Sequence, residues 1–319
     1  MKTAIIFGVS GQDGAFLSQL LLEKKYRVTG VSRNIHETSF SKLDKLKIRN
    51  KIELVSSPIN EYKKILQLIS DYEPDEIYNL AGQSSVALSF EMPFETFESI
   101  SIANLNLLEA IRILKMPIKL YNAGSSDCFG NTNGTAATEN TPLKPRSPYG
   151  VAKAAAYWQV ANYREAYNMF ACTGILFNHE SYLRPKRFVT RKIVSTACRI
   201  ARGSSEKLLL GNISIERDWG WAPEYVNAMW MMLQQQQPDD YIIATGSTFS
   251  LKDFIVNVFE YLNLDWNDYV QTDKKFLRPT DIQTISADPS KAEKLLHWKA
   301  KYSASDVAKM MVDAELEKD

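Results

Sequence analysis

The first 180 residues alternate short apolar runs with segments of helical periodicity, and this alternation constrains the fold more than any other feature. Apolar runs at residues 4–7, 27–31, 52–55, 76–80, 118–123 and 171–177 predict strands, and residues 15–22, 62–71, 104–114 and 149–167 predict helices between them. Strands joined through helices need right-handed crossovers, which make them parallel neighbours in one sheet. The pattern predicts an α/β fold with a doubly wound parallel sheet.

A glycine-rich turn joins the first predicted strand to the first predicted helix. Its residues are Gly8, Val9, Ser10, Gly11, Gln12, Asp13 and Gly14. Glycines permit the tight turn and let the backbone approach a pyrophosphate, while the helix N-terminus supplies unpaired N–H groups and a positive dipole end. The turn predicts a Rossmann-type dinucleotide site, with Gly8, Ser10, Gly11, Gln12, Asp13 and Gly14 as cofactor contacts. The alternative is a packing turn in a sheet protein without a cofactor.

The end of the second predicted strand indicates which dinucleotide is preferred. An NAD site usually has Asp or Glu there to hold the ribose 2′-hydroxyl. This chain has Ser32-Arg33 instead, and a guanidinium pairs well with a 2′-phosphate, so NADP is favoured over NAD. A surface arginine in a basic stretch is the alternative interpretation of Arg33. Further cofactor contacts are expected after the fourth strand, at Leu80, Ala81, Gln83 and Ser84.

Ser125, Tyr149 and Lys153, further along the chain, together predict redox chemistry. Tyr149 and Lys153 are four apart on one predicted helix, so they share a face. A nearby ammonium stabilises a phenolate and lowers the tyrosine pKa, so the tyrosine can exchange a proton during hydride transfer. Ser125, after the fifth predicted strand, supplies a hydroxyl that orients the substrate oxygen. The cofactor turn and these residues together predict an oxidoreductase-type site.

Beyond residue 178 the alternation breaks into long irregular stretches, at 180–187 and 210–223. Residues 241–245 predict one more strand, and residues 251–262 and 288–296 predict helices, while 42–51 predicts a solvated amphipathic helix. We expect a cofactor domain of residues 1–177, with 218–250 returning to it. A smaller C-terminal α/β domain of residues 178–217 and 251–319 would then bind the substrate.

Overall composition excludes several classes of partner. The 38 basic and 37 acidic side chains give a net charge of +1, which argues against a nucleic-acid partner. The three cysteines are too few and too scattered for a disulfide framework or a zinc site, so no metal is expected. With no secretory pattern and no run of 18 apolar residues, we expect a cytoplasmic protein with no membrane partner.

The sequence resembles the extended short-chain dehydrogenase/reductases, and within them the GDP-mannose 4,6-dehydratases. Besides the glycine turn and the Tyr149–Lys153 pair, the resemblance is carried by residues 74–81, 146–149, 162–167, 174–181, 188–192, 210–212, 217–220 and 278–280. It implies a redox-neutral dehydration. Tyr149 would take the 4-hydroxyl proton as the C4 hydride passes to NADP. A carboxylate would then remove the C5 proton and water would leave from C6. The hydride would finally return to C6.

The resemblance also implies roles for further residues. Tyr149, Lys153, His179 and Arg184 would contact the cofactor, and the GDP-sugar would be bound by Ser85, Asn178, Val189, Lys192, Asn212, Arg217 and Arg278. The cofactor strands depart from the family: Asn34 replaces a second arginine, and Ser57-Pro58 replaces Asp-Leu. The loop that follows Arg33 helps tetramers form in the family, and its altered sequence leaves a homodimer or a homotetramer open.

One departure concerns the chemistry itself. Where the family has glutamate two residues beyond the hydroxyl residue, this chain has Asp127, which is shorter by one methylene. A misplacement of about 1 Å can cost on the order of 100-fold in rate. Three interpretations stay open: a backbone shift that preserves dehydration, a different substrate such as a heptose, or C4 chemistry alone, as in a GDP-keto-sugar reductase or a 4-dehydrogenase. A non-catalytic NADP-binding sensor is a further alternative, but it would not need Ser125, Tyr149 and Lys153.

Overall fold

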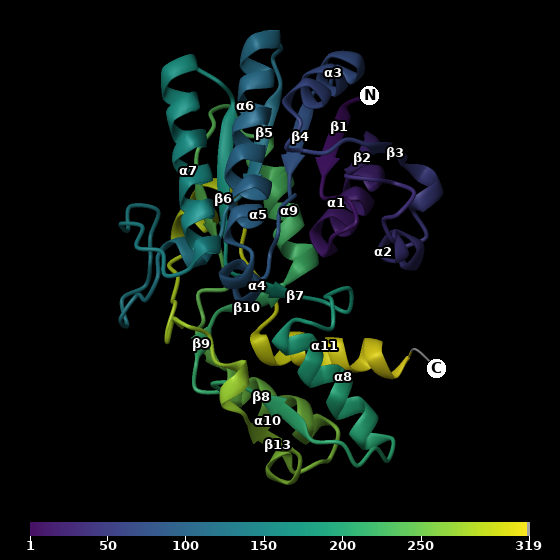
Figure 1. Ribbon diagram of the computed structural model, residues 1–319, viewed down its shortest axis with the longest axis vertical. Coiled ribbons are helices and arrows are strands. Elements are labelled where there is room, and N and C mark those ends of the chain that lie inside the picture. Colours follow the sequence, from purple (N-terminus) through teal and green to yellow (C-terminus); the bar gives the residue numbers. More distant parts are fainter. Residues whose placement is uncertain (318–319) are drawn as a thin grey trace.

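The computed structural model describes residues 1–317, and in them seven parallel strands form one central sheet (Figure 1). The strands are β1 (Thr3–Phe7), β2 (Arg27–Ser32), β3 (Glu53–Ser56), β4 (Glu76–Asn79), β5 (Lys119–Ala123), β6 (Ala171–Leu176) and β11 (Tyr241–Ile243), in the order β11-β6-β5-β4-β1-β2-β3. This confirms the predicted doubly wound parallel sheet. The strand order reverses between β1 and β4, and the crevice at such a reversal is where ligands bind in this class of fold.

Helices cover both faces of the sheet (Figure 1). One layer contains α1 (Gln12–Glu23) and α9 (Ala222–Leu233), and the other contains α3 (Tyr62–Tyr72), α6 (Ala103–Leu114) and α7 (Pro148–Tyr167). Ala4 and Ile6 of β1 pack with the first layer, whereas Ile5 and Phe7 pack with the second. Both faces of β1 are therefore buried, which explains why its sequence is continuously apolar rather than alternating.

The connections at the carboxyl ends of the strands hold short elements. These are α2 (Ser41–Lys45), η1 (Arg49–Lys51), α4 (Val86–Glu91), α5 (Pro93–Phe97), η2 (Glu98–Ile102) and η3 (Ser126–Cys128). The single helix predicted for 42–51 is wrong, because the backbone breaks at Lys47, whose φ is 56°. Leu43 and Ile48 are both buried, yet they would lie about 140° apart on a continuous helix. The break lets both side chains enter the core.

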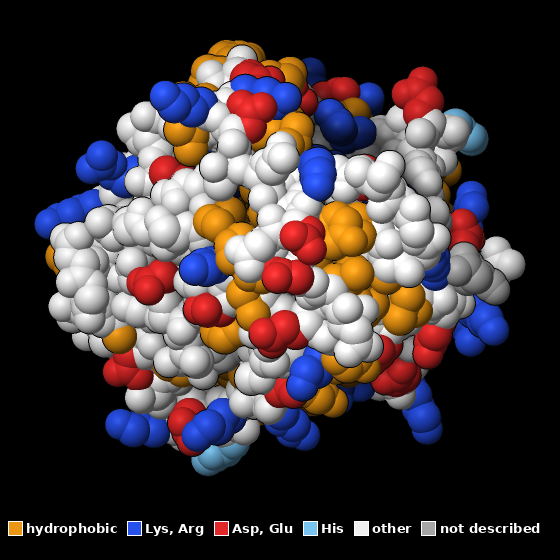
Figure 2. All heavy atoms as spheres, turned by 90° about the horizontal axis from the view of Figure 1, so that it is seen from below, with side chains coloured by type: hydrophobic (Ala, Val, Ile, Leu, Met, Phe, Trp, Pro, Cys, Tyr) orange, Lys and Arg blue, Asp and Glu red, His pale blue; other side chains and the backbone are white. Residues whose placement is uncertain are grey.

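A smaller unit lies beyond the carboxyl ends of the strands (Figure 1). It contains α8 (Val189–Ala201), α10 (Leu251–Tyr261), α11 (Ala304–Leu316) and the parallel pair β8 (Leu208–Leu210) and β13 (Val270–Thr272). Two further pairs connect it to the sheet: β7 (Asn178–Glu180) with β10 (Trp219–Trp221), and β9 (Glu216–Arg217) with β12 (Phe249–Ser250). Val194, Phe254 and Met311 are buried in its own apolar core. Figure 2 shows basic and acidic side chains interspersed over this end of the molecule.

Part of the C-terminal sequence packs on the sheet rather than within the smaller unit. Ile282 and Ile285 lie in one apolar cluster with Phe177 and Ile242. The helix expected over 288–296 begins slightly later: the backbone is helical from Ser290, continues as a π-helical turn, η6 (Ala292–Leu296), and ends where His297 turns left-handed. The two-domain boundaries proposed from the sequence stay a prediction. In the described residues, 1–317, no helix is long and apolar enough to cross a bilayer.

Candidate active site

A cavity of about 640 Å³ lies at the carboxyl ends of the sheet strands, facing the smaller unit. It brings together most of the residues selected from the sequence. Its lining includes Asp13, Leu80, Ala81, Gln83, Ser84, Ser85, Ser125, Asp127, Tyr149, Lys153, Asn178, His179, Arg184, Val189, Lys192, Asn212, Arg217 and Arg278. The turn residues Gly8, Ser10, Gly11, Gln12 and Gly14, and Arg33, lie outside this lining.

The glycine turn is packed too tightly for any side chain. A Cβ built on Gly14 would lie 2.3 Å from the carbonyl oxygen of Gly8, and one on Gly8 would lie 2.7 Å from that of Leu80. Helix α1 starts directly after Gly11 with no side-chain cap, so its first N–H groups lack a side-chain partner. A close-packed turn followed by an uncapped helix fits a nucleotide pyrophosphate.

Gln12 and Asp13 tie this turn to β7 across the crevice. The Gln12 amide donates to the His179 carbonyl at 3.2 Å and accepts from the Ser181 hydroxyl at 2.7 Å. His179 Nε2 lies 2.9 Å from the Asp13 carboxylate, and its Nδ1 lies 2.7 Å from the Phe177 carbonyl. Because both ring nitrogens face acceptors, the arrangement favours a protonated imidazole.

The electrostatics of this pair agree with that geometry. Burial alone would raise the pKa of Asp13, but the charge and hydrogen bond of His179 outweigh burial and lower that pKa to about 2. Burial likewise opposes protonation of His179, yet the Asp13 charge raises the pKa of His179 above its ordinary value. The charged pair therefore belongs to the folded state, and Gln12 and Asp13 hold protein segments together at the cofactor turn.

Tyr149 and Lys153 are placed by the start of α7. Ser147 caps this helix by accepting a hydrogen bond from the Gly150 N–H at 3.0 Å, and Pro148 occupies its first turn. The Lys153 ammonium donates to the Ala123 carbonyl at the end of β5 at 2.6 Å and lies 5.9 Å from the Tyr149 ring centroid. The tyrosine, the lysine and the end of β5 thus meet at one wall of the cavity.

These buried groups have perturbed proton affinities. Burial lowers the pKa of Lys153 to about 8. Burial, and next the Asp127 charge, raise the pKa of Tyr149, while a hydrogen bond with Ser125 opposes that rise. The lowered tyrosine pKa expected from the sequence is therefore wrong for this arrangement, because burial outweighs the nearby ammonium. Strongly perturbed groups that converge in a crevice are typical of proton-transfer sites.

Asp127 lies on the short helix η3, against the start of α7. A Cβ on Gly150 would come within 2.8 Å of the Asp127 carbonyl oxygen, so the glycine permits this approach. The Ser125 hydroxyl lies 3.3 Å from the Asp127 carboxylate, and it also accepts from the Asp127 N–H at 3.3 Å. The carboxylate is therefore drawn back toward Ser125 at the cavity wall.

The basic residues expected to bind the substrate differ in how far their charged groups are already hydrogen-bonded within the fold. Arg217 donates to the carbonyls of Glu216, Ile282 and Gln283, so its guanidinium is largely used within the fold. Arg278 is one-third exposed and lies 3.5 Å from Asp281. The Lys192 ammonium donates to the Leu209 carbonyl at 2.6 Å. Asn212 caps the local turn by accepting from Ser214.

Two further polar residues in the cavity were not selected from the sequence. Thr190, 1% exposed at the start of α8, has a hydroxyl with no hydrogen-bond partner among residues 1–317, and this helix begins without a side-chain cap from them. Glu180, 2% exposed, lies 3.2 Å from the Arg184 guanidinium, which stacks 3.8 Å from the Phe188 ring centroid. The only signal for either was its position inside a recognised motif, beside a selected residue.

The fold and the site define a Rossmann-type protein of the short-chain dehydrogenase/reductase class. Dehydratases and epimerases of nucleotide sugars share this architecture. A dTDP-glucose 4,6-dehydratase from Bacillus anthracis, solved with NAD, superposes with a TM-score of 0.87 at 18% identity, covering 100% of this chain and 97% of that one. A UDP-glucose 4-epimerase from Thermotoga maritima, solved with UDP-glucose, superposes with a TM-score of 0.88 at 19% identity, covering 99% of both chains.

The chain belongs to the GDP-mannose 4,6 dehydratase family, whose model matches residues 5–311. It is 44% identical over 326 residues to GDP-mannose 4,6 dehydratase 1 of Arabidopsis thaliana, covering 99% of this chain and 90% of the relative. It is 41% identical over 342 residues to the GDP-mannose 4,6 dehydratase of Dictyostelium discoideum, covering 99% and 96%. The family resemblance noted in the sequence is confirmed.

Proposed function

We propose that this protein dehydrates GDP-mannose to GDP-4-keto-6-deoxy-mannose with NADP as a recycled cofactor. The observation that carries the proposal is the convergence of Ser125, Asp127, Tyr149 and Lys153 on one cavity, beside a glycine turn that fits a dinucleotide. Relatives named for this activity align over nearly the whole chain, which supports the substrate. Structures with the same fold were solved with NAD, and one from Pseudomonas aeruginosa, called RMD, with NADPH.

The cavity and the glycine turn beside it offer two separate places for phosphates. The dinucleotide pyrophosphate fits the glycine turn at the start of α1. The GDP diphosphate fits the start of α8, where the helix is uncapped and the Thr190 hydroxyl is buried without a partner. Arg278 and Lys192 line the cavity as well, and a guanidinium suits the fork of phosphate oxygens.

In this proposal each catalytic side chain has one task. When bound, the nicotinamide would supply the hydride chemistry of the reaction, at C4 and later at C6. Tyr149 takes the proton of the 4-hydroxyl, and the Lys153 ammonium stabilises the resulting phenolate. Ser125 orients the C4 oxygen. Asp127 would remove the C5 proton, which the 4-ketone has acidified, and pass it to the C6 hydroxyl, which leaves as water. Once C6 has regained the hydride, C5 takes a proton from solvent and Tyr149 returns its proton to solvent, so no net oxidation occurs.

A second candidate is C4 redox chemistry alone, as a GDP-keto-sugar reductase or a GDP-hexose or GDP-heptose 4-dehydrogenase. The short Asp127 side chain, drawn back onto Ser125 at 3.3 Å, is the observation that favours it. A non-catalytic NADP sensor has less support, because binding alone needs neither the Tyr149–Lys153 pair nor Ser125.

One incubation separates these functions. With GDP-mannose and NADP in deuterated water, a dehydratase gives a 4-keto-6-deoxy product with deuterium at C5 and no net NADPH. Accumulating NADPH identifies a 4-dehydrogenase, and oxidation of added NADPH by a GDP-keto-sugar identifies a reductase. If GDP-mannose is recovered unchanged by mass spectrometry and NMR, the proposed substrate is wrong.

We also propose that the protein forms a homo-oligomer, a dimer or a tetramer, in the cytoplasm. Apolar side chains are exposed on the neighbouring elements α5, η2 and α7: Phe94 at 80%, Ile102 at 44% and Trp158 at 60%. A second copy is the occupant that fits such a helical face in an enzyme of this class. Light scattering should give a multiple of the 36.2 kDa chain mass, and Trp158→Asp should shift it toward the monomer.

A further inference from the structure

Arg33, the residue expected to recognise a 2′-phosphate, does not line the cavity. Its side chain is 82% exposed, and its closest acidic partner is Glu95 at 3.8 Å. An exposed pair of this kind contributes little binding energy. A less exposed cation near the glycine turn would contribute more than Arg33 to recognition of a 2′-phosphate.

The place where that phosphate must lie is defined by the sheet. Strands β1 and β2 pair in parallel with Phe7 opposite Val31, and the Gly8 N–H donates to the Val31 carbonyl at 3.3 Å. The glycine turn and the end of β2 are therefore adjacent. In a Rossmann-type site the adenosine ribose reaches the end of β2, where its 2′ substituent is recognised.

Lys42, on α2, reaches this region between the glycine turn and the end of β2. Its ammonium donates to the carbonyl oxygen of Ser10, in the middle of the glycine turn, at 2.8 Å. An ammonium has three N–H donors, so two stay available for a ligand. Lys42 is half-buried, and within residues 1–317 it forms no ion pair.

A second cation approaches from the smaller unit. Arg187 lies in the segment between β7 and α8, lines the cavity and lies 5.0 Å from the Phe188 ring centroid. Burial, and next the charges of Arg187 and Lys45, lower the pKa of Lys42, so these cations repel one another. Arg187 also has no ion pair among the described residues. Positive charge that no carboxylate balances favours a bound anion between the two side chains.

We propose that Lys42 binds the 2′-phosphate of NADP, that Arg187 closes over it from the smaller unit, and that this pair sets the cofactor preference more than Arg33 does. The inference rests on the proposed NADP function and deepens it. A 2′-phosphate is dianionic, so it matches two cations, whereas the neutral 2′-hydroxyl of NAD leaves them unbalanced.

The test compares affinities for NADPH and NADH by fluorescence titration of the full-length protein, without turnover. The key variant is Lys42→Met, which keeps the apolar stem and removes the charge. Wild-type protein should bind NADPH more tightly than NADH. Lys42→Met should weaken NADPH binding about 10-fold or more and change the affinity for NADH by less than about 2-fold, as the loss of a charged hydrogen bond predicts. Arg187→Met should also lower the affinity for NADPH and leave the affinity for NADH unchanged. Arg33→Ala should lower the affinity for NADPH less than Lys42→Met does.

Two controls make the result specific. Lys47→Met removes the same charge from an exposed residue in the same loop and should leave both affinities unchanged. Lys42→Arg keeps the charge and should keep the preference, which separates charge from folding. If wild-type protein binds NADH as tightly as NADPH, both the NADP function and this inference are overturned. If wild type prefers NADPH and Lys42→Met retains that preference, only the inference fails.

Discussion

At the residue scale, the reach of one carboxylate decides which reaction the site supports. Asp127 has the position of the elimination base but lies 3.3 Å from Ser125, so it competes for the hydroxyl that orients the C4 oxygen. Its charge also raises the pKa of Tyr149. In the proposed mechanism the same side chain would therefore affect both half-reactions, one by removing a proton and one through its charge.

Replacing Asp127 by Asn should separate the two half-reactions. Asn is isosteric and keeps a hydrogen-bonding partner for Ser125, but it cannot accept the C5 proton, so dehydration should fall by about 10²–10⁴-fold. Oxidation at C4, measured as transient NADPH absorbance, should persist. Asp127→Glu, which restores the family's chain length, should retain elimination. An Asp127→Asn variant that dehydrates at the wild-type rate would exclude this carboxylate as the base.

The Asp13–His179 pair predicts a pH-dependent stability. The pKa of Asp13 is depressed to about 2, so its contribution is complete above its unfolded pKa and is lost as pH falls through the folded one. The pKa of His179 is raised, so its contribution is complete below its unfolded pKa and lost as pH rises through the folded one. The pair should therefore stabilise the fold most between about pH 4 and 6.5.

Urea unfolding of wild type and Asp13→Asn across this range provides the measurement. The depressed pKa of Asp13 corresponds to about 2 kcal/mol, since each pKa unit is about 1.4 kcal/mol. The difference in unfolding free energy should approach that value near pH 5 and shrink toward pH 2. A difference that stays constant from pH 2 to pH 8 would contradict the ionic origin of this contact.

At the element scale, the start of α7 matters most, because its first turn carries Tyr149. The Ser147 cap and Pro148 define where the helix begins, and Gly150 lets η3 pack against it. The uncapped starts of α1 and α8 face the same cavity. Capped helix starts thus place catalytic side chains, and uncapped ones leave N–H groups for phosphates.

Two cap substitutions form a matched pair. Ser147→Ala and Ser303→Ala each remove a side-chain N-cap, at α7 and at α11, and each should cost about 1 kcal/mol of unfolding free energy. Only Ser147→Ala should also lower kcat, because only that cap positions the turn that carries Tyr149. Equal activities of the two folded variants would show that the α7 cap serves stability alone.

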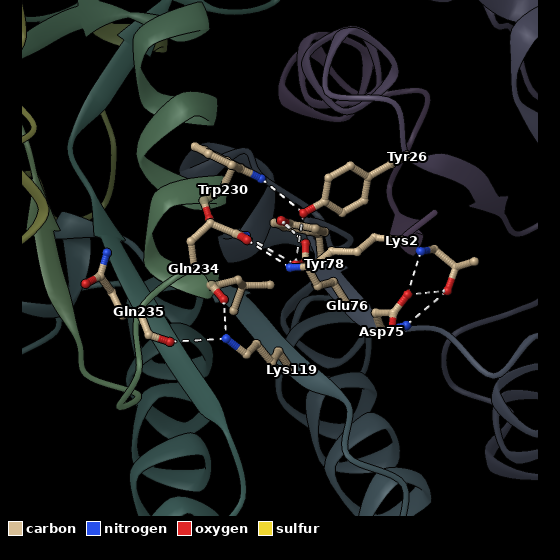
Figure 3. A network of polar contacts seen from close by, with 11 residues as sticks. Lys2, Tyr26, Asp75, Glu76, Tyr78, Lys119, Trp230, Gln234 and Gln235 are labelled. Carbon is tan, nitrogen blue, oxygen red and sulfur yellow. Dashed lines mark hydrogen bonds and ion pairs between the residues drawn. The ribbon is translucent and has the colours of Figure 1, made fainter.

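At the scale of the whole molecule, stability and chemistry are concentrated at opposite ends of the sheet. Figure 3 shows the polar network at the amino end, where Glu76, 1% exposed, accepts from Lys2, Tyr26, Tyr78 and Gln234. These donors come from four separate segments, so one carboxylate ties β1, β2, β4 and α9 together. The cavity lies at the carboxyl end, at the strand-order reversal.

Glu76→Ala should therefore destabilise the protein without changing the site. Leaving the hydroxyls of Tyr26 and Tyr78 without their acceptor should cost about 1–3 kcal/mol each, whereas the half-exposed Lys2 ammonium can be solvated. The urea midpoint should fall, whereas kcat and NADPH affinity of the folded fraction at low temperature should match wild type. A changed NADPH affinity would show that the two ends of the sheet are coupled.

The parts of the site that were predictable from sequence depend on local spacing. The parallel sheet, the glycine turn and the Tyr149–Lys153 pair follow from periodicity and from residues a few positions apart. The break at Lys47 was not predictable, because it serves the burial of two side chains in a core assembled from distant segments. Lys42 and Arg187 were not predictable for the same reason, since they are 145 positions apart in the sequence.

The sequence alone determined the architecture, the dinucleotide turn and the family, because these depend on short-range pattern and on motifs read along the chain. The tertiary structure decided which hydrogen-bond or ion-pair partner each polar group has. It used Gln12, Asp13 and Arg217 within the fold, turned Arg33 toward solvent and left the Thr190 hydroxyl and the α8 start unpaired in the cavity. The physical reason is that a polar group's availability depends on neighbours that only folding brings within hydrogen-bond distance.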